Sequence, residues 1–150
     1  MKLLKFIFYF IPFLISGFVF KYDSTFYNNL SKPSFTLPSV YFSIIWIIIF
    51  ILISISIVMV SSKQSIIKNK DYFYSLLSVY FSIYAFNIMF WVLKSPIFGF
   101  ILSICTFITS IIFYKETKRI INKSSLLLLP FILQTIYAVI LSGFIFFMNF

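Results

Sequence analysis

The sequence predicts an all-α membrane protein, a bundle of five transmembrane helices, and three observations support this fold class. Hydrophobic residues make up 62% of the 150-residue chain and charged residues only 10%, whereas a soluble domain carries about 25% charged residues. The hydrophobic residues fall into five long stretches. Each stretch reaches the roughly 17–25 residues that a helix needs to cross a bilayer, whereas barrel strands alternate in polarity over about 10 residues.

The predicted helices cover residues 3–20, 40–60, 72–93, 97–114 and 125–148. Lys5, near the start of the first range, is the one charged residue inside these ranges. Charges are absent from the middle of every range, where each would cost about 2.5–3.5 kcal/mol. The connections leave no room for a soluble domain, so we expect one membrane domain over residues 1–150, with its longest loop, residues 21–39, facing outward. Pro130 is expected to kink the last helix, because proline removes a backbone hydrogen bond.

The first stretch has an alternative interpretation. Lys2 and Lys5, followed by an apolar run, also describe a secretory signal peptide. The run is long for a signal peptide, and no small-x-small cleavage site stands near residues 18–24. We therefore expect it to remain as a membrane helix, and sequencing of the mature N-terminus distinguishes the two alternatives.

The net charge of +9 does not indicate a nucleic-acid partner, because the basic residues follow the positive-inside pattern of membrane proteins. Nine of them lie on the side of the N-terminus: Lys2, Lys5, Lys63, Lys68, Lys70, Lys115, Lys118, Arg119 and Lys123. Three lie on the other side: Lys21, Lys32 and Lys94. This pattern predicts a cytoplasmic N-terminus and attachment of the cluster at residues 115–123 to anionic lipid headgroups.

Residue types that carry catalysis or bind metals are scarce. The chain has no histidine, and its single cysteine, Cys105, lies within a predicted helix, so neither a disulfide nor a Cys/His metal site is expected. The spans hold no acid–base pair and no activated nucleophile. We therefore predict no catalytic residues, no metal and no cofactor.

The outward loop differs from the other connections in length and composition. Pro33 and Pro38 stiffen it, and it carries five large apolar residues: Phe26, Tyr27, Leu30, Phe35 and Leu37. Loops of this length tend to be functional lids or disordered segments, and the aromatic content argues against disorder. The composition favours a lid, and the alternative is a set of rings in the interfacial aromatic belt.

The loop and its flanks resemble a known family. Residues 26–38 read FYNNLSKPSFTLP, and Phe42 and Trp46 follow in the second predicted helix. This pattern resembles the signature of the translocator protein (TspO/MBR) family, also called tryptophan-rich sensory proteins or peripheral benzodiazepine receptors. Residues 85–87 (AFN) and 127–131 (LLLPF) resemble its third and fifth helices. The chain departs from the family in having 2 Trp against 23 Phe.

The resemblance implies a five-helix bundle, often a homodimer, with a pocket inside the bundle under the first loop. It implies hydrophobic ligands, namely porphyrins and haem, sterols or synthetic aromatic compounds. Carried over position by position, it implies a pocket wall of Gly17, Phe42, Trp46, Phe50, Asn87, Phe90, Gln134 and Ala138, and a lid with Tyr27, Lys32 and Pro33. Sterol handling fits poorly, because no basic residue follows Tyr137 as the family's sterol-recognition pattern requires.

Several of these residues also fit a purely structural role. Asn87 and Gln134 place amides deep in the spans, where an interhelical hydrogen bond averages about 0.6 kcal/mol. A phenylalanine in so apolar a chain can be ordinary packing, whereas Trp46 matches the motif inside its helix. Gly17 could allow close approach of helices. Lys32 could pair with a porphyrin propionate or stay solvated.

The functional prediction is a ligand-binding or sensor protein for a porphyrin-like or similar hydrophobic molecule. A small exporter of such ligands and a structural protein with a vestigial pocket are alternatives. Transporters usually contain inverted repeats and broken helices, and neither is evident in the sequence. Light-dependent porphyrin breakdown, which the resemblance associates with pocket tryptophans, leaves an enzymatic role open. Residue usage rich in Ile, Lys, Asn, Phe and Tyr favours a bacterial inner membrane.

Overall fold

The computed structural model describes all residues from 1 to 150, and its regular structure is entirely helical. Five helical segments are long and apolar enough to cross a membrane: Lys2–Val19, Ser39–Lys63, Lys70–Val92, Pro96–Ile120 and Asn122–Met148. The predicted fold class, an all-α bundle of five transmembrane helices, is therefore confirmed.

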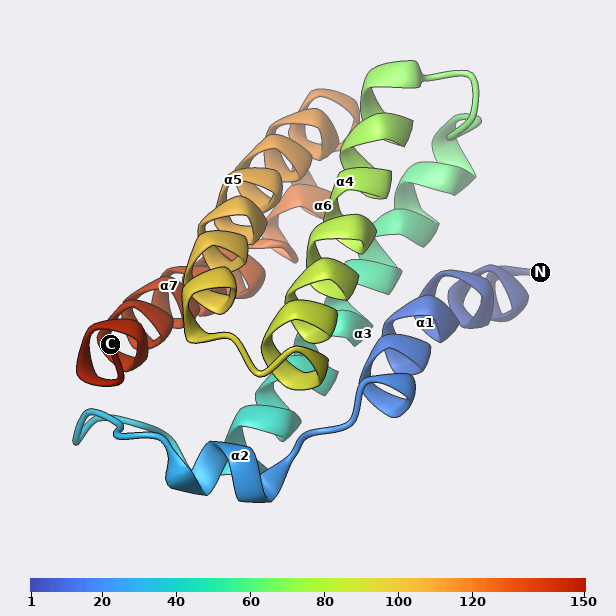
Figure 1. The fold of residues 1–150 in the computed structure, drawn as a ribbon. Helices are drawn as coiled ribbons and strands as arrows, with labels where there is room; N and C mark the ends of the chain where they lie inside the picture. The colour runs from blue at the N-terminus through green and yellow to red at the C-terminus, as the bar shows by residue number, and fades with distance from the viewer.

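The helices form one bundle in which α5 packs between α4 and α7, and α1 packs against α3 and α4 (Figure 1). In chain order the elements are α1 (Lys2–Val19), α2 (Ser24–Asn29), α3 (Ser39–Lys63), α4 (Lys70–Asn87), a π-helical turn η1 (Ile88–Val92), α5 (Pro96–Ile120), α6 (Asn122–Leu126) and α7 (Leu129–Met148). The segment that contains α2 crosses one end of the bundle, below α3 and the α4–α5 turn in Figure 1.

Two helices extend further than predicted at their basic ends. The second predicted helix covers residues 40–60 and the fourth covers residues 97–114, whereas α3 reaches Lys63 and α5 reaches Ile120. Each helix continues beyond its apolar run, because cations in the last turn interact favourably with the helix dipole and the terminal carbonyls. Lys118 and Arg119 occupy that position in α5.

The fifth predicted helix, residues 125–148, is interrupted. It begins earlier, as α6 at Asn122, breaks at Leu127 and Leu128, and resumes as α7. Pro130 lies in the first turn of α7, where its missing N–H costs no helical hydrogen bond. The proline thus starts a new helix instead of kinking a continuous one.

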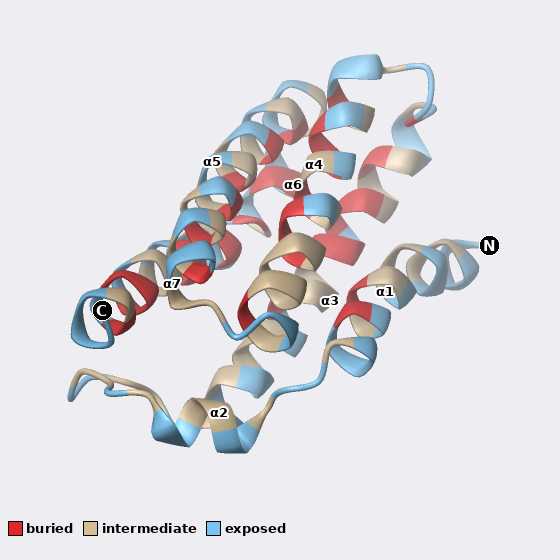
Figure 2. Ribbon diagram, in the orientation of Figure 1, coloured by how far each residue is buried: buried red, intermediate tan, exposed pale blue.

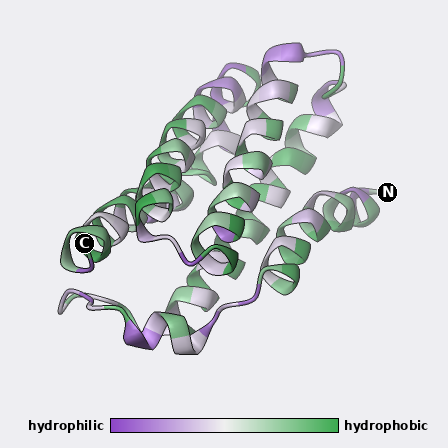
Figure 3. Cartoon of the chain, viewed as in Figure 1, coloured by the Kyte–Doolittle hydropathy of each residue, from purple (hydrophilic) through white to green (hydrophobic).

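Burial and hydropathy are arranged as a bilayer requires. Buried residues face the centre of the bundle (Figure 2), where Phe13, Ile53 and Phe131 are among the core side chains that are at most 1% exposed. Large apolar side chains also point outward, such as Phe81 with 75% of its surface exposed. The helices are hydrophobic along most of their length, and the hydrophilic residues gather at their ends (Figure 3). Exposed apolar faces of this extent fit contact with lipid.

Buried hydroxyl groups connect neighbouring helices. The Oγ atoms of Ser103 on α5 and Ser142 on α7 lie 2.7 Å apart. Ser82 on α4 lies 3.1 Å from Thr109 Oγ1 on α5. Such contacts between small side chains let helices approach closely and contribute about 0.6 kcal/mol each in a membrane.

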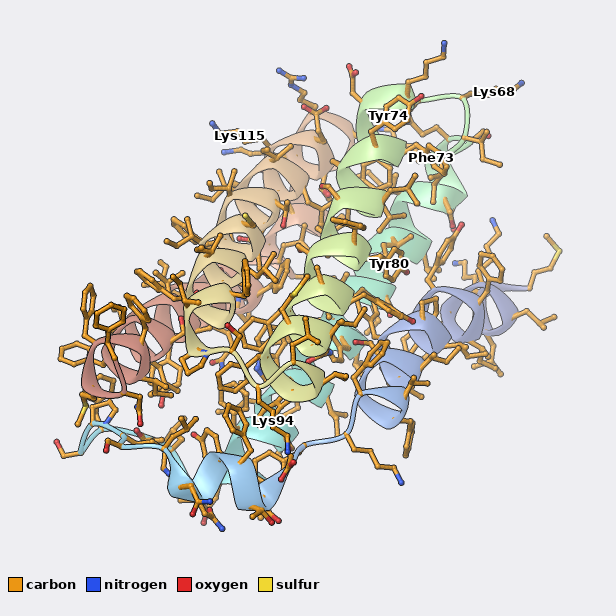
Figure 4. The ribbon with its side chains drawn as sticks, in the orientation of Figure 1. Lys68, Phe73, Tyr74, Tyr80, Lys94 and Lys115 are labelled. Carbon is orange, nitrogen blue, oxygen red and sulfur yellow. The ribbon has the colours of Figure 1, made fainter.

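The basic residues divide unequally between the two ends of the bundle. Lys68 and Lys115 lie at one end, and Lys94 lies at the other, beside the α2 segment (Figure 4). The structure therefore places the long loop at the end that carries fewer cations.

Candidate ligand-binding site

The bundle contains a partly open cavity of about 360 Å³ at the end where the α2 segment lies. Its 25 lining residues come from α1, α3, α4, η1, α5, α7 and the loop, and 17 of them are hydrophobic. None of the lining residues is Asp, Glu, Lys or Arg. The site is thus an apolar chamber inside the membrane-spanning region.

One wall of the cavity is a row of aromatic rings on α3. Phe42, Trp46 and Phe50 follow each other at four-residue intervals, which places them on one helix face. The ring centroids of Phe42 and Trp46 are 6.2 Å apart, and those of Trp46 and Phe50 are 5.5 Å apart. Phe13 of α1 continues the row, stacked on Phe50 at 4.7 Å and 9° between ring planes.

A second aromatic group forms where α4 ends in the π-helical turn. Phe90 and Trp91 are consecutive, yet both line the cavity, because a π turn shifts the register of side chains relative to an α-helix. The Trp91 ring contacts Tyr22 at 5.1 Å and Tyr27 at 5.8 Å between centroids. These rings join the wall of the bundle to the loop above it.

The polar lining consists of neutral groups. The Asn87 side-chain amide donates to Ser16 Oγ at 2.5 Å, which links α4 to α1. Asn87 therefore makes the interhelical bond expected of a structural residue and lines the cavity as well. Helices α5 and α7 add four residues with hydroxyl groups to the lining: Ser103, Thr106, Thr135 and Ser142.

The loop is fixed at its start by Asp23. One carboxylate oxygen accepts a hydrogen bond from the Phe26 N–H at 2.9 Å and caps α2, and the other lies 2.8 Å from Lys94 Nζ. The hydrogen bond from Lys94 and the one from Phe26 hold the pKa of this carboxyl below its ordinary value. Lys94 adopts a left-handed conformation, with φ of 51°, at the α4–α5 turn.

The far part of the loop is fixed to α7 and the C-terminus. The Tyr137 hydroxyl accepts from Leu37 N–H at 3.1 Å and donates to Phe35 O at 3.3 Å. The Asn149 side chain pairs with the Ser31 backbone in both directions: its Oδ1 accepts at 2.9 Å and its Nδ2 donates at 2.8 Å. The loop is thus fixed at both ends, and Tyr22 and Tyr27 of its first half line the cavity.

The structure brings most of the predicted site residues to one place. Eight of the eleven line the cavity: Gly17, Tyr27, Phe42, Trp46, Phe50, Asn87, Phe90 and Ala138. At Gly17, an added Cβ would meet no atom within 4 Å, so this glycine does not serve a close helix contact.

Lys32, Pro33 and Gln134 lie outside the cavity lining. Lys32 Nζ donates to the carbonyls of Tyr27 at 2.6 Å and Leu30 at 3.0 Å, so it stabilises the loop. The Pro33 carbonyl accepts from Thr36 N–H at 3.1 Å within a turn. Gln134 is 8% exposed, and its Nε2 has no hydrogen-bond partner.

Sequence reasoning missed Trp91 and Phe13 as lining residues. Trp91 carried a usable signal, because it is one of only 2 tryptophans in the chain, and both line the cavity. Phe13 carried none, since it is one of 23 phenylalanines and lies in a run of apolar residues.

The comparison with protein families gives a decisive match. Residues 8–148 match the model of the TspO/MBR family. The chain belongs to the TspO/MBR family. The resemblance inferred from the loop motif is thereby confirmed.

Two bacterial relatives cover most of the chain. It is 32% identical over 130 residues to "Uncharacterized membrane protein YtaB" of Bacillus subtilis strain 168, which spans 87% of this chain and 84% of the relative. It is 27% identical over 137 residues to "Tryptophan-rich protein TspO" of Bacillus cereus, which spans 91% of this chain and 89% of the relative. Family membership and the five apolar helices identify an integral membrane protein.

Proposed function

We propose that this TspO/MBR protein is a membrane receptor that binds a porphyrin, another tetrapyrrole or a similar hydrophobic aromatic ligand inside the helix bundle. The observation that carries the proposal is the cavity of about 360 Å³ with its aromatic walls and its fixed loop. Pockets for small molecules measure about 300–1,000 Å³ and combine apolar walls with a few polar groups.

The α3 face suits a planar ligand. Stacking on an aromatic ring contributes about 0.5–1.5 kcal/mol beyond the burial of apolar area. Phe42, Trp46 and Phe50 offer such contacts along one wall, and Asn87 lines another part of the cavity. No histidine is present, so we expect a tetrapyrrole to be held by stacking and polar contacts and not through an iron ligand.

The contacts of α1 support a role for this helix in sensing. Tyr80 and Tyr84 of α4 donate hydrogen bonds to the α1 carbonyls of Tyr9 at 2.7 Å and Pro12 at 2.6 Å, and the Tyr80 side chain lies between the two helices (Figure 4). The cavity adjoins these contacts, since Phe13 lines it. We propose that a ligand which binds one position of α1 more tightly than another shifts α1 toward that position, the change that a sensor needs.

The proposed location is a bacterial inner membrane with the N-terminus in the cytoplasm. The excess of basic residues at the end opposite the long loop supports this orientation. The two relatives come from Bacillus species. Family resemblance adds a homodimer to the proposal, which crosslinking in the membrane tests.

The direct test is a titration with protoporphyrin IX in detergent, followed by quenching of tryptophan fluorescence. We expect saturable binding that weakens about tenfold in Trp46→Ala, which corresponds to about 1.4 kcal/mol. The matched control is Phe81→Ala, an aromatic residue on the lipid face, which should bind as the wild type does. Absence of saturable binding would overturn the proposal and favour a structural role.

The same preparation separates the alternatives. An exporter requires porphyrin flux in liposomes above protein-free leakage, and an enzyme requires new product spectra under light. The helix break at Leu127 and Leu128 does not favour transport, because neither residue lines the cavity.

A further inference from the structure

We infer that the cavity opens sideways into the membrane between α1 and α3, and that ligands enter it from the lipid phase through this opening. The inference rests on the proposed binding function and adds the route by which a ligand reaches the site. Its basis is the distribution of exposed residues around the cavity, the open space beside Gly17 and the contacts that hold α1 and the loop.

The exposed part of the cavity lining is confined to one side of the bundle. Five lining residues are also exposed on the outer surface of the protein: Gly17, Phe18, Tyr22, Ser43 and Ile47. Four of them belong to α1 and α3, which pack against each other, and Tyr22 lies in the link between α1 and α2. Every lining residue of α4, η1, α5 and α7 is buried or half-buried. The wall is therefore incomplete between α1 and α3.

Gly17 marks the edge of this opening. An added Cβ at Gly17 would meet no atom within 4 Å, whereas one at Gly99 would lie 2.5 Å from Phe90 Cδ2. At Gly143 the added Cβ would lie 3.0 Å from the Phe100 ring. Of the 3 glycines in the chain, the one that lines the cavity is thus the one with free space beside it. Such space is what a gap between α1 and α3 requires.

The opening extends to a depth where the membrane is apolar. Ile47 follows Ser39, the first residue of α3, by eight positions, which is roughly 12 Å along a helix. The rim side chains Phe18 and Ile47 are 70% and 47% exposed. Ser43 Oγ donates to Ser39 O at 3.0 Å within the helix, so its proton is already used. Such a rim faces lipid chains, and an apolar ligand passes it without entering water.

The loop side of the cavity is held by polar contacts. Asp23 pairs with Lys94 at 2.8 Å. The Asn149 side chain makes two hydrogen bonds to the Ser31 backbone, at 2.9 and 2.8 Å. Moving the loop aside to admit a ligand from water breaks these contacts.

The seam between α1 and α3 is held differently. The one hydrogen bond between these helices joins Lys5 Nζ to Ser61 O at 3.3 Å, at the end of α1 opposite Gly17. The other side-chain hydrogen bonds that α1 makes to a helix run to α4. Widening the opening near Gly17 therefore breaks no hydrogen bond between α1 and α3.

The test measures the rates of protoporphyrin IX binding when the rim of the opening is narrowed. Gly17→Phe places a ring in the free space. Val19→Phe adds the same ring on the same helix, at a position that is 63% exposed and outside the lining. Each full-length variant is studied in nanodiscs, with association followed by quenching of tryptophan fluorescence and dissociation by its recovery after addition of excess empty liposomes. Protein-free nanodiscs give the rate at which the porphyrin itself enters and leaves the membrane.

We expect both rate constants of Gly17→Phe to fall about tenfold while its Kd changes by less than about twofold, because an obstructed route slows entry and exit alike. Val19→Phe should behave as the wild type does. Wild-type rates in Gly17→Phe, or a weaker Kd with an unchanged association rate, would overturn the inference and leave the proposed function standing. Absence of saturable binding to the wild type would overturn both.

A second variant narrows the opening from the α3 side. Ser43→Phe should slow association and dissociation as Gly17→Phe does, which retains the test if the glycine variant does not fold. Its control is Ile44→Phe, at a neighbouring position that is 48% exposed and outside the lining. Equal slowing in Ile44→Phe would contradict a route through the opening.

The loop provides the opposite test. Asn149→Ala removes the side-chain hydrogen bonds to Ser31 and should leave the association rate unchanged, because the ligand does not pass the loop. Faster association in Asn149→Ala would show entry from water and overturn the inference.

Discussion

At the scale of single residues, small side chains define the cavity as much as large ones do. A Cβ added at Gly99 would lie 2.5 Å from Cδ2 of Phe90. The Phe90 ring is 4% exposed and packs against Phe26 at 5.5 Å and Trp91 at 4.7 Å. The absence of a side chain at Gly99 therefore allows Phe90 to hold its place in the cavity wall.

This contact predicts opposite effects at two helical glycines. Gly99→Ala should destabilise the protein by about 1–3 kcal/mol, the usual cost of overpacking, because the Phe90 ring must shift. Gly17→Ala should be neutral or stabilising by up to about 1 kcal/mol, because its new methyl group meets no neighbour. Thermal unfolding in detergent compares them, and equal stability of the two variants would contradict the packing described for Phe90.

A second residue-scale prediction concerns the Asp23–Lys94 pair. The pKa of Asp23 is lowered in the folded protein, so the pair stabilises the closed loop above the ordinary Asp pKa of about 3.9. That contribution is lost as pH falls through the lowered value. Trp91 fluorescence in a Trp46→Phe background should therefore change in one step below about pH 4.

The matched variants assign that step. Asp23→Asn should remove it while retaining the cap of α2, since asparagine caps helices as well as aspartate does. Asp71→Asn, which removes a carboxylate from the first turn of α4, should retain it. Persistence of the step in Asp23→Asn would show that another group titrates.

At the scale of elements, the loop lies at the end of the bundle that holds the cavity, and its anchors fix it there. The prolines and aromatic residues of the loop predict a lid, and the structure places the loop over one end of the bundle (Figure 1). The anchors were not predictable, because Asn149 and Ser31 are separated by 118 residues in the chain. The π-helical turn at Ile88–Val92 has no local sequence signal either, since its residues are as apolar as the helix before it.

The Asn149 anchor gives an element-scale prediction. Asn149→Ala removes both side-chain hydrogen bonds to Ser31, each worth about 0.5–1.5 kcal/mol. We expect faster amide hydrogen exchange at Ser31 by roughly tenfold, with little change in the helices. Asn29→Ala alters an exposed loop amide and should leave the exchange rate unchanged. Equal rates in Asn149→Ala and the wild type would show that the anchor does not hold the loop.

At the scale of the whole molecule, hydropathy alone predicts five spans, because long apolar helices have no other stable environment. The family resemblance predicts eight residues that line the cavity. Most of them lie on long helices, and each helix presents a fixed face once its register is known. Gln134 shows where this reasoning stops: it is buried beside lining residue Thr135, and the sequence does not reveal which neighbouring side chains cover it. Lys32 was expected to face either a ligand or water, but the carbonyls it binds lie two and five residues away.

The central claim is that the ligand occupies the space inside the bundle, and steric blocking tests it most directly. Ala138→Phe adds a ring to a lining position of α7. Leu133→Phe adds a ring at an outward position of the same helix, where the leucine is 67% exposed. Titrated with protoporphyrin IX dimethyl ester in nanodiscs, Ala138→Phe should bind at least about tenfold more weakly than the wild type, equivalent to about 1.4 kcal/mol, and Leu133→Phe should bind normally. Wild-type affinity in a folded Ala138→Phe variant would contradict the claim.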